Sequence, residues 1–213
     1  LMCRVTKLLF LILILASNLT FGQSGYERAM TRGIQMIKNA KVPEDMNRAE
    51  GYFEQIAGTE KNQWLPYYYA AFTKILTAYL YESSNKDYIA HKAESMIFKA
   101  DSLQPDNSEI YCLKHMVASL AFQVDPGNRW LSYGVEAGAA LDKAKRLDPS
   151  NPRPYVLEGL QLMNAPGEYG GSKEKAKVAF KKALDLFENF KPISDIAPSW
   201  GLEQAKTALE GLD

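Results

Sequence analysis

The chain has 213 residues, of which 46% are hydrophobic and 23% are charged, a composition typical of a folded globular protein and not of a disordered one. The 25 Lys and Arg residues balance the 25 Asp and Glu residues, and this lack of excess positive charge argues against binding of nucleic acid or of an anionic membrane surface. Two His and two Cys residues leave little material for a metal site.

The first 22 residues have the order of a secretory signal peptide. Arg4 and Lys7 provide positive charge, residues 8–16 (LLFLILILA) are all apolar, and residues 17–22 (SNLTFG) turn more polar and end in a small residue. A membrane-spanning helix needs about 20 apolar residues, so an uncleaved N-terminal anchor is the less favoured alternative. We therefore expect cleavage after Gly22, a periplasmic or secreted protein, and no membrane insertion after cleavage.

Cleavage at this point would remove Cys3 and leave Cys112 as a single thiol. An exported protein with one thiol cannot form an intramolecular disulfide, even though its compartment is oxidising. We expect residues 23–213 to form one domain that is stabilised by packing alone.

A repeat with a period of 44 residues determines the expected fold. Small and apolar residues recur at spacings of four and three, and a proline follows five residues later. The two complete copies are Ala93, Ile97, Ala100 and Pro105, and then Ala137, Leu141, Ala144 and Pro149, with partial copies starting at Ala49 and Ala176. A second column with the same period consists of Tyr67, Tyr111 and Tyr155, followed four residues later by Ala71, His115 and Gly159. Two columns with one period predict a stack of similar helical units.

These spacings have a direct structural meaning. Residues four and three apart lie on one side of a helix, and alanine on that side allows a neighbouring helix to approach closely. The proline ends the helix, and Asn107 or Asn151, two residues further on, is suited to capping the next one. A single helix pair buries too little surface to be stable alone, so the pairs are expected to stack.

The pattern resembles the tetratricopeptide repeat (TPR) family, in which an aromatic residue and then a small residue mark the first helix and Ala-x3-Phe-x2-Ala marks the second. The resemblance covers about residues 47–190 and departs from the family in its spacing, since the repeats begin at 49, 93, 137 and 176. It implies an all-α fold, a TPR-like right-handed solenoid of antiparallel helix pairs with about nine helices. The repeat units are expected to start near residues 26, 63, 107 and 151.

We expect helices at nine places and no strands. The expected helices are residues 26–40, 46–58, 63–82, 87–103, 107–123, 130–147, 151–163, 172–189 and 198–211. The last of these is apolar on one side and charged on the other, and it is expected to cap the stack.

Candidate catalytic residues have simpler structural explanations. His115 takes the position of an alanine and a glycine in its sister repeats, so a packing or polar contact is expected, and His91 has no second ligand at metal spacing. Cys112 has no His in a recognisable nucleophile arrangement. Residues 167–173 (GEYGGSK) lack the order of a phosphate loop, and Ser172 is expected to cap a helix instead. We expect no catalytic site, no metal and no cofactor.

The TPR resemblance implies that the first helix of each pair lines a concave groove. Residues one, five and eight positions after each tyrosine of the column would then face it: Tyr68, Cys112 and Val156; Phe72, Met116 and Leu160; Ile75, Ser119 and Met163. None of the nine is charged, which suits an apolar peptide or partner helix and does not suit the carboxylate-binding mode of chaperone-binding TPR proteins. The alternative is that the N-terminal helix or the last helix covers these residues, which would then be core.

We interpret the chain as an exported, non-catalytic interaction or scaffold module that binds an apolar peptide or partner helix in this groove. The alternative is a carrier of a small molecule or lipid that serves an envelope transport system. The partner, the pathway and the oligomeric state are left open by the sequence.

Overall fold

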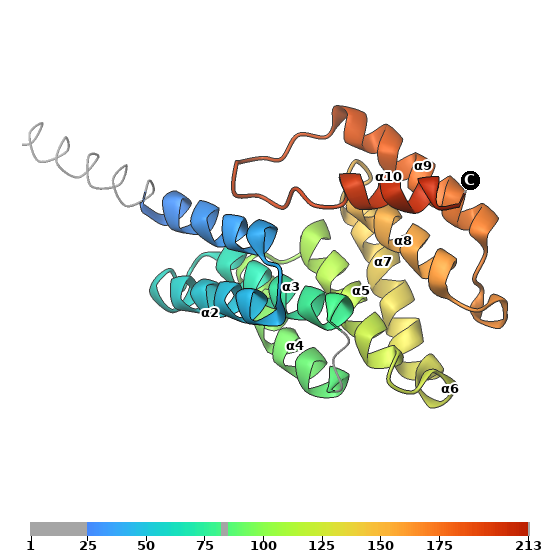
Figure 1. The fold of residues 1–213 in the computed structure, drawn as a ribbon, viewed down its shortest axis with the longest axis horizontal. Helices are drawn as coiled ribbons and strands as arrows, with labels where there is room; N and C mark the ends of the chain where they lie inside the picture. Colours follow the sequence, from blue (N-terminus) through green and yellow to red (C-terminus); the bar gives the residue numbers. More distant parts are fainter. Residues whose placement is uncertain (1–24, 82–84, 213) are drawn as a thin grey trace, which may run out of the picture.

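The computed structural model describes residues 25–81 and 85–212, and in these ranges every regular element is a helix, as the sequence predicted (Figure 1). The predicted signal peptide, residues 1–22, lies outside the described residues. None of the described helices has the length and apolar character needed to cross a membrane.

The helices follow one another with short connections. The first spans residues 25–39. It is followed by α2 (Pro43–Thr59), α3 (Trp64–Leu80), α4 (Lys86–Leu103), α5 (Ser108–Phe122), the short α6 (Pro126–Arg129), a π-helical turn (Trp130–Gly134), α7 (Val135–Leu147), α8 (Arg153–Asn164), a 3-10 turn (Gly167–Tyr169), α9 (Lys173–Asn189) and α10 (Leu202–Glu210). α3 packs against α2 and α4, α5 packs against α4 and α7, and α8 packs mainly against α9.

The first repeat column lies in the core and the tyrosines of the second, Tyr67, Tyr111 and Tyr155, pack half-buried against it, which confirms the physical basis of the predicted stack. The stripe with spacings of four and three is buried in all four copies: Ala49, Phe53 and Ile56; Ala93, Ile97 and Ala100; Ala137, Leu141 and Ala144; Ala176, Phe180 and Ala183. In the second column, Ala71, His115 and Gly159 are buried as well. α4 and α7 end two residues before the two predicted proline stops, and the side chain of Asn107 accepts a hydrogen bond from the backbone N–H of Glu109 at the start of α5.

The buried apolar residues form two clusters. The larger one draws mainly on α2 to α5, and the smaller one contains residues of α8, α9 and α10. α8 contributes to both clusters, since Val156 belongs to the smaller and Leu157 to the larger. Ile196 also belongs to the larger cluster, although it lies between α9 and α10. We call this connection, residues 190–201, the crossing segment; Figure 1 shows it leaving the C-terminal helices as a long loop and returning to them.

Three predicted helix starts differ from the structure by three or more residues. The helix expected from residue 46 begins at Pro43, since proline is suited to the first position of a helix. The capping helix expected at 198–211 begins only at Leu202, because Gly201 has a φ of 109°, a left-handed conformation that glycine adopts without strain. The helix expected at 130–147 is preceded by α6, where the Asp125 side chain accepts a hydrogen bond from the backbone N–H of Asn128, and it passes through the π-helical turn before α7 begins.

The close contact between α8 and α9 makes Gly159 sensitive to substitution. A Cβ at Gly159 would lie 2.5 Å from the ring of Phe180, which is fully buried and has no room to move. We expect Gly159→Ala to lower the free energy of unfolding by about 1–3 kcal/mol. Gly138→Ala in α7 is the matched control, because a Cβ there meets nothing within 4 Å, and it should raise stability by up to about 1 kcal/mol. Urea unfolding monitored by circular dichroism measures both, and equal effects would contradict the helix contact.

Candidate functional site

The structure places most of the nine predicted groove residues in the core. Six of them are buried: Tyr68, Phe72, Ile75, Cys112, Met116 and Val156. The other three, Ser119, Leu160 and Met163, are half-buried. The open apolar groove expected along these positions is therefore closed at six of them in the structure.

We call the nine predicted groove positions on α3, α5 and α8 the concave strip. The crossing segment covers part of this strip, which the sequence had not suggested. The hydroxyl of Tyr69 donates a hydrogen bond to the carbonyl oxygen of Ile196 (3.1 Å), and the indole N–H of Trp200 donates one to the hydroxyl of Tyr68 (2.9 Å). The ring of Trp200 also stacks on Phe72, with ring centroids 5.4 Å apart. Cover by the N-terminal or last helix was expected as the alternative, and both helices contribute: Met30 belongs to the larger cluster, and Ala205 of α10 lies in one cluster with Val156. The contacts with Tyr68, Tyr69 and Phe72 come from the loop before the last helix.

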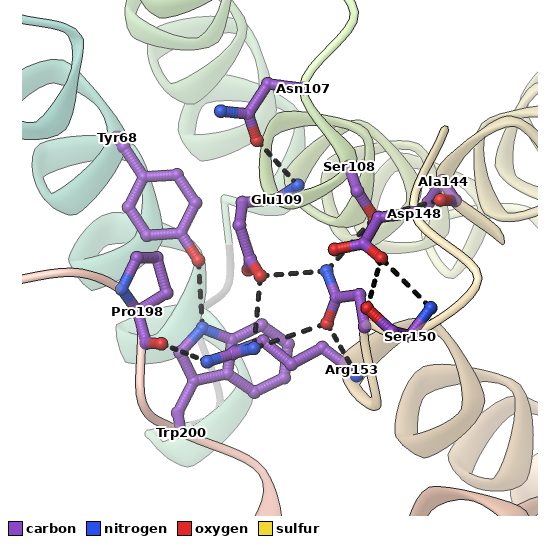
Figure 2. Close-up of polar contacts among 11 residues, drawn as sticks. Tyr68, Asn107, Ser108, Glu109, Ala144, Asp148, Ser150, Arg153, Pro198 and Trp200 are labelled. Carbon is purple, nitrogen blue, oxygen red and sulfur yellow. Dashed lines mark hydrogen bonds and ion pairs between the residues drawn. The ribbon is translucent and has the colours of Figure 1, made fainter. Parts of the chain in front are cut away.

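A buried ion pair holds the crossing segment to α5 and α8. The guanidinium of Arg153 is fully buried, and its Nη1 lies 3.0 Å from Oε1 of Glu109. Arg153 also donates a hydrogen bond to the carbonyl oxygen of Pro198, and its guanidinium lies over the rings of Phe190 and Trp200 at 4.7 and 5.6 Å. Figure 2 shows this guanidinium between Glu109 on one side and the Pro198 carbonyl on the other. The pair thus joins the first turns of two helices to the segment that crosses them.

Asn151 connects the same network to α5. Its amide donates to the Ser108 hydroxyl (3.0 Å) and to Glu109 (2.8 Å), while its oxygen accepts from the backbone N–H of Arg153 (3.0 Å). Asn151 was predicted to cap the next helix, and the structure adds a link between two repeats. Ser108 in turn donates to the carbonyl oxygen of Ala144 at 2.9 Å.

Burial dominates the electrostatics of Glu109. Loss of hydration raises the pKa of its carboxyl to about 7, although the charge of Arg153 and the hydrogen bond from Asn151 lower it. The second carboxylate oxygen, Oε2, and the Nε of Arg153 are buried without a hydrogen-bond partner. The ion pair therefore determines which parts of the chain come together. It adds little to the free energy of unfolding, because the loss of hydration offsets the attraction between the two charges.

A cavity of about 590 Å³ lies beside this network, lined by the start of α5, the connection between α7 and α8, the end of α9 and the crossing segment. Its size is within the usual range of small-molecule pockets. Its charged lining residues are Asp106, Glu109, Asp148, Asp185 and Lys191, and its walls include the apolar side chains of Trp64, Phe190 and Ile193. Asp106 is ion-paired with Lys143 and Glu109 with Arg153, so Asp148, Asp185 and Lys191 leave the lining weakly negative, which does not favour an anionic ligand.

The predicted chemistry-bearing residues have structural roles. Nδ1 of His115 lies 3.0 Å from the carbonyl oxygen of Ala137, and burial lowers the pKa of this imidazole, so the ring is neutral. Burial raises the pKa of the Cys112 thiol well above its usual value, which keeps the thiol protonated. His91 is exposed on α4, and Ser172 accepts a hydrogen bond from the backbone N–H of Lys175 as the cap of α9. In residues 25–81 and 85–212, no group of three or more His, Cys, Asp or Glu residues is arranged to hold a metal ion.

An exposed apolar surface lies at the other end of the helix pairs, around the π-helical turn. Its residues, which we call the aromatic edge, are Phe122, Val124, Trp130, Leu131, Val135 and Tyr169. The distance between ring centroids is 5.8 Å for Trp130 and Phe122 and 5.7 Å for Trp130 and Tyr169. Leu131 is 86% exposed, and Trp130 keeps 38% of its surface exposed. Large exposed apolar surfaces mark sites of binding, and π-helical turns occur often at functional sites.

The π-helical turn itself explains how Trp130 is presented. A Cβ at Gly134 would lie only 2.7 Å from the Trp130 ring, so the turn brings the indole against a residue without a side chain. Arg129, at the end of α6, pairs with Asp87 of α4 through its second nitrogen at 3.0 Å, which ties this turn to the neighbouring helix pair.

Our sequence reasoning did not identify the aromatic edge. The signal was present, since residues 124–135 fall between two repeat columns and contain Trp130, Leu131 and Tyr133 without a counterpart in the other repeats. Exposed aromatic residues outside a repeat column have no packing role to explain them, and this criterion would have selected the segment.

The raised pKa of Glu109 predicts a specific pH dependence of stability. The carboxyl binds a proton more tightly in the folded state than in the unfolded state, where its pKa is near 4.5, so its contribution to stability is complete below pH 4.5 and is lost as the pH rises to about 7. Relative to Glu109→Gln, the unaltered chain should therefore lose up to about 3 kcal/mol between roughly pH 5 and pH 8. Urea unfolding at several pH values measures the difference. Glu188→Gln on the exposed side of α9 is the control, and a difference independent of pH would contradict the burial argument.

Comparison with known proteins places the fold. No protein-family model and no curated protein matches the sequence. Among solved structures, the chain superposes on the HusA haemophore from Porphyromonas gingivalis with a TM-score of 0.78 and 33% sequence identity, covering 88% of this chain and 92% of that chain. It also superposes on a thermophilic TPR protein of Thermus thermophilus with a TM-score of 0.63 and 16% identity, covering 88% and 80% of the two chains.

The two likenesses carry different weight. At 16% identity, the Thermus protein shows that the fold is TPR-like and shows nothing more. The likeness to the haemophore extends over nearly the whole of both chains at an identity that indicates common descent. The chain belongs to the family of the HusA haemophore.

Proposed function

We propose that this protein is an exported carrier of the haemophore type, which binds a haem-class tetrapyrrole and passes it to another component of the cell envelope. The observation that carries the proposal is the 33% identity to a haemophore across 92% of that protein's chain. Export rests on the signal peptide that the first 22 residues predict.

The order of preference between the two functions considered from the sequence is reversed. Binding of a partner peptide in an open groove was the first interpretation, and it loses support because six of the nine predicted groove residues are buried. A small-molecule carrier was the alternative, and kinship with a haemophore supports it.

The aromatic edge is the better of two places for such a ligand. A haem-class tetrapyrrole is a flat apolar ring with carboxylate groups, so it needs aromatic or aliphatic surface and must avoid fixed negative charge. The cavity beside Glu109 offers apolar walls, but after the pairing of Asp106 with Lys143 and of Glu109 with Arg153 its lining is still weakly negative, which does not favour the carboxylates of the ligand. The aromatic edge offers the rings of Phe122, Trp130 and Tyr169 with exposed Leu131 and Val135 beside them.

An open surface also suits a carrier. A ligand held on an exposed face can be taken over by an acceptor without unfolding of the carrier, whereas a fully enclosed ligand must wait for an opening step. The half-exposed indole of Trp130 and the exposed Leu131 would provide such a face.

Truncation of Trp130 tests this site. We expect Trp130→Ala to weaken haem binding about 5- to 30-fold, because loss of a stacked ring costs about 1–2 kcal/mol. Titration followed by the Soret absorbance measures the Kd. The overall fold should be retained, since Trp130 is partly exposed and outside both buried clusters.

Two matched variants make the result specific. Phe98→Ala removes an aromatic side chain that is 75% exposed on α4, away from the aromatic edge, and Ile193→Ala removes an exposed side chain from the wall of the cavity. Neither should change the affinity. A loss with Ile193→Ala and none with Trp130→Ala would place the ligand in the cavity, and equal losses in all three would indicate non-specific adsorption.

The composition of the aromatic edge also predicts how the ligand is recognised. Its six residues include no His, Cys or Met, and Tyr169 is the one side chain among them that can ligate haem iron, so most of its contacts would be to the ring. We expect metal-free protoporphyrin to bind within about threefold of haem. Fluorescence titration of the metal-free ring measures this. Strong dependence on iron that disappears in His91→Ala would contradict the prediction and assign iron binding to the exposed histidine of α4.

A further inference from the structure

The cavity beside Glu109 has no part in the proposed function, yet it has the general features of a ligand site. Its volume of about 590 Å³ is within the usual range of small-molecule pockets. Trp64, Phe190 and Ile193 give it apolar walls. Asp185 and Ile193 are exposed, so a ligand from solvent can reach the cavity on this side.

The negative charge of the cavity comes from two aspartates. Asp148 accepts hydrogen bonds from the backbone N–H and the hydroxyl of Ser150, at 2.9 and 2.6 Å, and neither donor carries a charge. Asp185 lies on the exposed side of α9. Within the part of the chain that the structure describes, neither aspartate forms an ion pair. Beside low-dielectric apolar walls, such charges favour a cation.

Glu109 adds an unused hydrogen-bond acceptor to this lining. Its Oε1 accepts from Arg153 at 3.0 Å and from Asn151 at 2.8 Å, while Oε2 is buried and has no donor. Burial raises the pKa of the carboxyl, and the charge of Asp148 also raises it, so the two carboxyl groups lie close enough to repel each other. A positively charged donor would supply the missing hydrogen bond and relieve the repulsion.

We propose that this cavity binds a primary amine with an apolar body. The ammonium group lies near Asp148 and donates to Oε2 of Glu109, and the apolar body lies against Trp64 and Phe190. Contact with Oε2 needs a small rotation of the Glu109 side chain, since that atom is buried. The cavity shares no residue with the aromatic edge, so this site goes beyond the proposed function.

The lining selects a primary amine among the possible cations. A metal ion is unsuited, because the described residues offer no group of three His, Cys, Asp or Glu side chains to hold one. A quaternary ammonium group has no N–H to donate to Oε2. A primary ammonium group has three N–H donors on a compact charge, and an apolar body attached to it buries its surface against the cavity walls.

The test titrates the full, isotope-labelled chain with probes that share one apolar body: phenethylamine, hydrocinnamate and trimethylphenethylammonium. We expect saturable binding of phenethylamine with a Kd of about 0.1–1 mM. Hydrocinnamate should bind at least about tenfold more weakly because its charge is negative, and the trimethyl compound about fivefold more weakly because it has no N–H. NMR chemical shifts measure the affinities, and the indole N–H signal of Trp64 should move while that of Trp130 should not.

Variants of the two aspartates locate the charge that is recognised. Asp148→Asn and Asp185→Asn each remove one negative charge and keep the side-chain shape, so each should weaken phenethylamine binding about 3- to 10-fold. Asp142→Asn is the matched control, because it makes the same change at an exposed position of α7 that does not line the cavity. It should leave the affinity unchanged.

The comparison of probes needs no variant, so it decides the matter even if a variant fails to fold. Absence of saturable phenethylamine binding, equal affinity for hydrocinnamate, or shift changes at Trp130 without any at Trp64 would overturn the proposal. Equal affinity for the trimethyl compound would overturn the choice of a primary amine, and an equal loss with Asp142→Asn would overturn the site. No probe is a tetrapyrrole, so these outcomes leave the proposed carrier function untouched.

Discussion

The position of one buried cation organises this structure. Arg153 has no exposed surface, and a buried guanidinium is tolerated only where its charge is paired and its N–H groups are hydrogen-bonded. Its partners come from distant parts of the chain: Glu109 on α5, the Pro198 carbonyl in the crossing segment, and the rings of Phe190 and Trp200. These parts must therefore assemble together. Regular stacking of helices alone would leave the loop between α9 and α10 free to lie elsewhere.

This constraint joins the two apolar clusters. α10 belongs to the smaller cluster, but the segment leading to it first places Ile196 in the larger one and Trp200 against Phe72. The N-terminal repeats and the C-terminal helices are thus connected by side-chain packing as well as by α8. The same contacts remove Tyr68 and Phe72 from solvent, so the concave face that a TPR-like stack usually offers to partners is partly used for internal packing.

Charge and exposure distinguish the two candidate ligand sites, the cavity beside Glu109 and the aromatic edge. The cavity beside Glu109 has the volume of a ligand site, but its lining stays weakly negative even with Asp106 and Glu109 ion-paired, which does not favour an anionic tetrapyrrole. The aromatic edge exposes Trp130 and Leu131 at a π-helical turn. For the carrier function that we propose, in which the ligand must be released, an exposed aromatic face meets the physical requirements better than a weakly acidic cavity. The comparison of the two sites bears on function because the chain belongs to the family of the HusA haemophore.

The sequence by itself determined the helices, their stacking and the cap residues, because spacings of four and three along a helix report directly which side is buried. Ala93, Leu141 and Phe180 were assigned to the core on this basis and lie there, and His115 was correctly expected to make a structural contact. Only the tertiary structure decided that the crossing segment covers part of the concave strip and that Trp130 is exposed. The contacts of the crossing segment join residues 127 and 132 positions apart and follow no period. An extended segment has no repeating face, so no local pattern can tell which distant surface it will cover.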